Sequence, residues 1–136
     1  MDEALEHLYH YSLHHPSPDF IHQHVVDVST AQWADENTKP ISLLFSLVGL
    51  CLYLEHGFTG KQIQFAHMKL AKHKDRFPGL TVNTVRCKPL LNEVLRAPAG
   101  EERDAQLKRW CSQVWNAYKA EHANIRTFLK EQHIVK

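Results

Sequence analysis

The chain has 136 residues and a mass of 15.8 kDa, which is the usual size of one domain. Its 16 Lys and Arg against 15 Asp and Glu leave a formal net charge of +1, which argues against binding nucleic acid or an anionic membrane through bulk charge. The 43% hydrophobic and 23% charged contents are typical of a folded, water-soluble protein. We therefore expect one domain over residues 1–136, with neither nucleic acid nor membrane as a partner.

The three cysteines, Cys51, Cys87 and Cys111, are widely spaced and form neither a disulfide framework nor a zinc-knuckle pattern. Such cysteines favour a reduced compartment. The start of the chain lacks the basic residues and apolar run of a signal peptide. The longest uncharged stretch, residues 40–54, is short for a membrane span. We therefore expect a cytoplasmic location.

Periodic apolar residues predict two helices in the first quarter of the chain. The first covers residues 2–13 and ends at the segment 14–18, because the prolines there break the helical pattern. The second covers about 20–34, with Asp19 as its N-cap. Its apolar residues form two stripes on different sides, so we expect neighbouring helices to cover it on both.

The third predicted helix, about 40–56, is apolar on nearly all sides, which is typical of a helix at the centre of a bundle. We expect Gly57 to end it in the left-handed conformation. Thr59 and Gln62 then match a capping box. This box predicts the start of a fourth helix that runs to about Arg76.

The remaining third of the chain predicts one more long helix. Residues 80–85 alternate weakly and indicate an extended segment, and residues 89–95 indicate one or two helical turns. The last helix covers about 101–131, and acidic residues in its first turn suit the helix dipole. Together the elements predict an all-α fold, a helical bundle of four long helices plus a short N-terminal helix.

The 11 histidines direct attention to imidazole chemistry. Three of them, His24, His67 and His122, lie on or at the edge of the inward stripe of a long predicted helix. Metal sites in helical bundles are built from inward side chains on facing helices, and three protein ligands with an open position are typical of a catalytic metal. We therefore hypothesise that these residues bind a zinc- or nickel-like divalent ion.

Asp27 and Gln32 are the candidate catalytic residues, and Trp115 is expected to shape a pocket. Asp27 follows His24 by three residues on one helix, so its carboxylate is placed to orient the imidazole. A metal-free alternative is acid/base chemistry by this pair. In a non-catalytic alternative, the histidines are satisfied within the core and the protein is an interaction module or a homodimer. No phosphate loop, nucleophile elbow or dinucleotide motif identifies a substrate.

Three segments resemble a family of small bacterial proteins of unknown function. They are FIHQHVVDVSTAQ (20–32), DENTKPISLLFSLVGLCLYLEHGFTGKQIQFAHMKLA (35–71) and APAGEERDAQLKRWCSQVWNAYKAEH (97–122), which together cover most of the chain. The resemblance implies no reaction, but it makes His22 a rival to His24 as a metal ligand. It adds weight to the positions that match recurring features of the family, namely His22, Asp27, Gln32, Lys39, His67, Trp115 and His122.

The predicted architecture is similar, more distantly, to DinB-like thiol-dependent transferases, which are small four-helix proteins with a three-histidine metal centre. This similarity implies metal-dependent chemistry in the interior of the bundle. The chain departs from the pattern of these proteins because its last predicted helix has no His-xxx-His pair. The similarity therefore concerns the fold alone.

Overall fold

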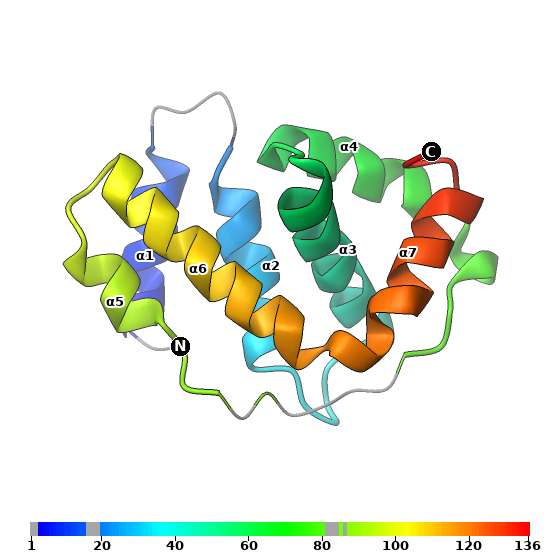
Figure 1. The fold of residues 1–136 in the computed structure, drawn as a ribbon, viewed down its shortest axis with the longest axis horizontal. Helices are drawn as coiled ribbons and strands as arrows, with labels where there is room; N and C mark the ends of the chain where they lie inside the picture. Colours follow the sequence, from blue (N-terminus) through cyan, green and yellow to red (C-terminus); the bar gives the residue numbers. More distant parts are fainter. Residues whose placement is uncertain (1–2, 16–19, 81–84, 86) are drawn as a thin grey trace.

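The structure is a computed structural model that describes residues 3–15, 20–80, 85 and 87–136. All regular elements in this part of the chain are helices, as the sequence predicts (Figure 1). They are α1 (Glu3–Leu13), α2 (His22–Gln32), α3 (Pro40–His56), α4 (Gly60–Ala71), η1 (Lys74–Arg76), α5 (Leu91–Arg96), α6 (Glu101–Ala117), η2 (Lys119–Glu121) and α7 (His122–Glu131).

The apolar helix α3 lies at the centre of the fold, where it packs against α2, α4, α6 and α7. Pro40 occupies its first turn, and Gly57 ends it with a φ of 67°, as predicted. The predicted capping box is also present, because Thr59 Oγ1 accepts from the Gln62 backbone at 3.2 Å and Gln62 Oε1 accepts from the Thr59 backbone at 2.8 Å. Each of the α-helices in the described ranges contributes buried apolar side chains to one core.

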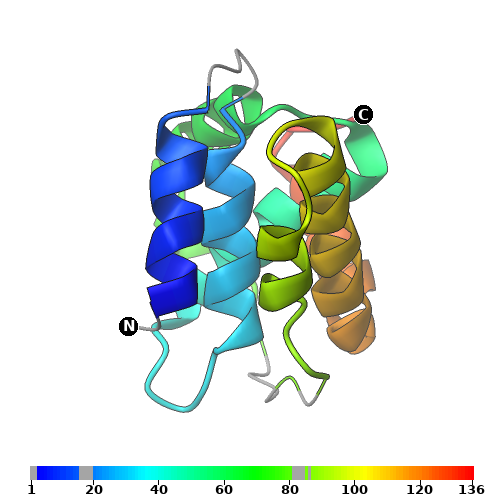
Figure 2. The ribbon, with the colours of Figure 1, turned by 90° about the vertical axis from the view of Figure 1, so that its left-hand side faces the viewer.

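Helix α2 is enclosed by α1, α3, α4 and α6, and Figure 2 shows α1 and α2 side by side. The stripe of Val25, Val28 and Ala31 is buried against these neighbours, whereas Val26 and Trp33, which form the second stripe, are only partly covered. The predicted cover is therefore present on one side only. Trp33 follows α2 and is 45% exposed, and its ring contacts Trp110 edge-on. The second stripe thus stays partly exposed at Trp33, and the homodimer stays a prediction.

The predicted helix over 101–131 is wrong, because the chain turns sharply between α6 and α7 through η2. At this turn His122 Nε2 donates to the Trp115 carbonyl at 2.8 Å, which occupies an acceptor near the end of α6. The buried Tyr118 hydroxyl donates to the Ala31 carbonyl of α2, also at 2.8 Å. These two side-chain bonds stabilise the turn, which the apolar periodicity does not reveal.

Other boundaries also differ from the predictions. Helix α2 begins at His22, two residues later than predicted, and Asp19 lies outside the described residues. Helix α4 ends before Arg76, which belongs to the short turn η1. Residues 81–84 of the expected extended segment are also outside the described part, whereas α5 confirms the predicted helical turns after residue 89. None of the described helices has both the length and the apolar character needed to cross a membrane.

Candidate functional site

The three histidines expected to bind a metal do not share a centre. His24 stacks on Tyr53 with 3.6 Å between ring centroids. His67 donates to a backbone carbonyl of α3 at 2.9 Å, and His122 donates to a carbonyl of α6. Across the described ranges, the one group of at least three Cys, His, Asp or Glu with ligand atoms within 4.8 Å of one another contains none of these histidines. Each ring is held at its own helix interface, so the expected convergence is absent.

The expected pair of His24 and Asp27 does not form either. Asp27 is buried and accepts a hydrogen bond from Gln23 at 3.0 Å, and burial raises the pKa of its carboxyl group. Asp27 Oδ2 and His24 Nδ1 are both buried without a hydrogen-bond partner among the described residues. The rival ligand His22 shares a 2.7 Å hydrogen bond with Ser12 through Nδ1.

Gln32 uses both polar ends of its side chain within the fold. Its Oε1 accepts from Trp110 Nε1 at 2.8 Å, and its Nε2 donates to the Cys87 carbonyl at 3.2 Å. The side chain therefore ties α2 to α6 and to the segment before α5. This arrangement gives Gln32 a structural role in the core, where it is 4% exposed.

A pocket of about 590 Å³ lies beside the turn between α6 and α7 and reaches α3. His122, the first residue of α7, stacks on Trp115 with 3.9 Å between ring centroids. The turn thus brings together a histidine and a tryptophan that the sequence singles out. The pocket is lined by Leu54, Glu55, Ser112, Trp115, Asn116, Lys119, His122 and Arg126.

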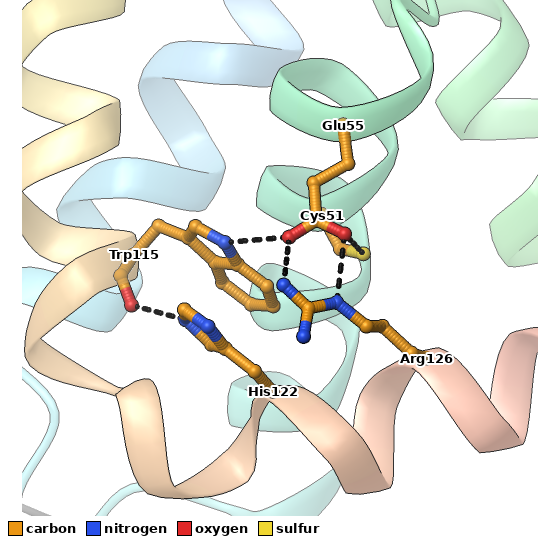
Figure 3. Close-up of polar contacts among 5 residues, drawn as sticks. All are labelled: Cys51, Glu55, Trp115, His122 and Arg126. Carbon is orange, nitrogen blue, oxygen red and sulfur yellow. Dashed lines mark hydrogen bonds and ion pairs between the residues drawn. The ribbon is translucent and has the colours of Figure 1, made fainter.

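Glu55 is the centre of the polar contacts beside this pocket (Figure 3). Arg126 donates from Nε to Oε1 at 2.9 Å and from Nη2 to Oε2 at 2.7 Å. Trp115 Nε1 also donates to Oε2, at 3.1 Å, and the Cys51 thiol lies 3.8 Å from Oε1. Hydrogen bonding from Arg126 is the main cause that lowers the pKa of Glu55. An ionised carboxylate is thus held between α3, α6 and α7.

The same carboxylate belongs to a group of potential metal ligands at the end of α3. The ligand atoms of Cys51, Glu55 and His56 all lie within 4.8 Å of one another. Cys51 and Glu55 are four residues apart and so share a helix face, and His56 is exposed. Burial raises the pKa of the Cys51 thiol to about 12, so an ion bound there has to displace its proton.

This donor set suits zinc and similar divalent ions, which bind thiolate, carboxylate and imidazole groups. Bonds of about 2.0–2.3 Å in a tetrahedral site place the ligand atoms about 3.5 Å apart. The three ligand atoms, now within 4.8 Å of one another, therefore have to move closer together to bind one ion.

The sequence patterns identify His122 and Trp115 in this region but miss the three potential ligands and Arg126. The available signal was the four-residue spacing of Cys51 and Glu55 on a predicted helix. Arg126 had no comparable signal, since 71 residues separate it from Glu55.

A family profile described as "Family of unknown function (DUF5946)" matches residues 2–119. The matched range includes the three potential ligands and Trp115, and it ends before α7. No curated protein and no solved structure matches the chain. The similarity to DinB-like bundles therefore stays a prediction.

Proposed function

We propose that this chain, which belongs to the family of unknown function DUF5946, binds a zinc-like divalent ion through Cys51, Glu55 and His56. The observation that carries the proposal is the proximity of their ligand atoms, all within 4.8 Å of one another. Three protein ligands and an open position are typical of catalytic zinc. The pocket beside Glu55 supports this interpretation, because it leaves room for a small molecule.

The surroundings of Glu55 also support the proposal. Carboxylates that bind metals are usually oriented by hydrogen bonds from neighbouring groups. Trp115 provides such a bond to Glu55 Oε2, at 3.1 Å. The side chain of Arg126 is 49% exposed, so water and salt screen its ion pair with Glu55 and a divalent cation can compete for the carboxylate.

The chemistry of such a site follows from the ion and the pocket together. A bound divalent ion polarises a substrate oxygen or lowers the pKa of a bound water to about 7. His122 and Trp115 line the adjacent pocket and would contact the substrate rather than the ion. We therefore place the metal-dependent chemistry at the end of α3, and not among the three histidines inferred from sequence.

Titration with cobalt(II) tests the proposal, because a cobalt–thiolate bond gives a charge-transfer absorption band in the near ultraviolet. We expect saturation at one equivalent with such a band. Cys51→Ser should abolish the band. His56→Gln removes a ligand and should weaken cobalt binding by at least about ten-fold, which is what the loss of an outer-shell partner costs. The matched controls Cys87→Ser and His73→Gln should behave as wild type. A band that persists in Cys51→Ser, or no saturable binding, would contradict the proposal.

Exposed apolar side chains on α4 favour a second candidate function, the binding of another protein. Phe65 and Met68 are three residues apart on one face and are 68% and 64% exposed. A second copy of the chain is one occupant of this face. Sedimentation at high micromolar concentration tests it, since self-association that Phe65→Ser removes would support a homodimer, and a monomer would exclude it.

A further inference from the structure

We propose that the pocket between α3, α6 and α7 binds a small organic anion and that a metal ion on Glu55 strengthens this binding by releasing Arg126. The anion is a carboxylate or a phosphate on an apolar or aromatic group. The linkage to the ion depends on the proposed function, whereas the anion site depends only on the residues of the pocket.

The lining of the pocket fits such a molecule. Its charged residues are Glu55, Lys119 and Arg126, which leave an excess of one positive charge. Trp115 and His122 add stacked aromatic rings, on which flat organic groups pack well. The volume of about 590 Å³ lies within the range of small-molecule sites, roughly 300–1,000 Å³. Positive charge beside flat rings is therefore the chemistry that would recognise the ligand.

In the structure, however, the guanidinium of Arg126 is occupied by Glu55. Its Nε and Nη2 groups donate to the two oxygens of this carboxylate at 2.9 and 2.7 Å. No hydrogen bond from its third nitrogen, Nη1, is found among the described residues. Without an ion, Lys119 is thus the one Lys or Arg of the pocket lining for which the described part of the chain shows no ion pair with a carboxylate.

A metal ion would weaken the pairing of Arg126 with Glu55 through a single oxygen atom. Glu55 Oε1 accepts from Arg126 Nε and is also the oxygen beside the Cys51 thiol, at 3.8 Å. An ion bound to this oxygen neutralises the carboxylate charge of Glu55, which in the metal-free protein attracts Arg126. The local charge also rises by one, because the ion adds two positive charges and the thiol loses one proton. Arg126 can then turn its donors to an anion in the pocket.

This arrangement requires reciprocal effects, because coupling between two binding sites is the same in both directions. An organic anion should bind more tightly when zinc is present, and zinc should bind more tightly when the anion is present. The probes are benzoate and phenyl phosphate, with benzyl alcohol as the neutral control. Binding is measured by calorimetry and by the indole N–H resonance of Trp115, which Trp115→Phe assigns.

We expect saturating zinc to tighten the binding of benzoate, phenyl phosphate or both by about five-fold or more. The difference between these two probes identifies the ligand as a carboxylate or a phosphate. Benzyl alcohol should show no zinc effect. If neither anion binds, or if zinc leaves both affinities unchanged, the proposal is overturned.

Variants separate the two parts of the proposal. In the metal-free protein, Glu55→Gln should tighten anion binding by about the same factor as zinc does in the wild type. The reason is that the substitution removes the carboxylate charge that pairs with Arg126. Lys119→Gln should weaken anion binding about five-fold with or without zinc, and the matched control Lys130→Gln should have no effect. A zinc effect that survives Arg126→Gln would mean that the anion binds the ion directly, which overturns the release of Arg126.

Failure of the metal site and failure of the anion site are also distinguishable. If cobalt(II) does not bind, the linkage is overturned together with the proposed function. The metal-free comparison of wild type with Glu55→Gln still decides whether Glu55 restrains Arg126. If this variant binds anions no more tightly than wild type, the proposed role of Arg126 is wrong even in a protein that binds cobalt.

Discussion

His24 is a buried imidazole whose charged form the folded protein excludes. It is 4% exposed and stacks on Tyr53, and burial lowers its pKa to about 4. In the unfolded chain the pKa is about 6.5. As the pH falls below 6.5, the unfolded chain therefore binds a proton that the folded protein does not, and the folded state loses stability until the pH reaches about 4.

The substitution His24→Phe should remove this pH dependence, because phenylalanine keeps a ring against Tyr53 and does not titrate. Between pH 7 and pH 4.5, the free energy of unfolding should fall by about 2.5 kcal/mol more in wild type than in the variant. Urea unfolding at the two pH values measures the difference. The variant His7→Gln alters an exposed histidine and should retain the wild-type dependence. Equal changes in wild type and His24→Phe would show that His24 titrates normally.

The burial of single residues could be predicted from the sequence more readily than their partners. The periodicity correctly places His24 on the inward edge of its helix. It does not show that the ring meets Tyr53, because this contact depends on how α2 and α3 are rotated against each other. The bonds between Glu55 and Arg126 were hidden for the same reason, since 71 residues separate the two.

Helices α2 and α3 approach closely where Asp27 faces Gly49. A Cβ atom on Gly49 would lie 1.8 Å from Asp27 Oδ2, so a glycine is needed to make room for the buried carboxyl group. Burial raises the pKa of Asp27, which favours the neutral acid at this contact. The close packing of α2 against α3 therefore depends on Asp27 and Gly49 together.

We expect Gly49→Ala to lower the free energy of unfolding by about 2 kcal/mol, because the added methyl group overpacks the contact with Asp27. In the Asp27→Ala background the same substitution should cost about 1 kcal/mol less, since the carboxyl group is gone. Urea unfolding of the wild type, the two single variants and the double variant measures this coupling. The control Gly79→Ala adds a Cβ with no heavy atom within 4 Å and should cause little change. A cost that is the same in both backgrounds would contradict the close contact.

The ends of helices were predictable where capping residues close in the sequence determine them. Gly57, Thr59 and Gln62 act through neighbouring backbone groups, and the predicted caps are present. The turn between α6 and α7 had no such signal. It depends on the hydrogen bond from Tyr118 to Ala31, which joins residues 87 positions apart. A continuous apolar stripe therefore predicted one helix where the chain forms two.

At the scale of the whole molecule, the all-α fold with a central apolar helix was predictable because apolar periodicity reports burial. The positions of functional side chains were not, because their meeting depends on the crossing angles and rotations of packed helices. Three inward histidines therefore suggested one centre, whereas the fold separates them. The same packing brings Trp115 and Arg126 to Glu55 at the end of α3.

The central claim is that one divalent ion is bound by Cys51, Glu55 and His56. Zinc K-edge X-ray absorption of the protein loaded with one equivalent of zinc tests this claim most directly. We expect one sulfur ligand at about 2.3 Å and nitrogen or oxygen ligands at about 2.0–2.2 Å, with the sulfur shell lost in Cys51→Ser. A ligand shell of nitrogen and oxygen alone in the wild-type protein would contradict the account.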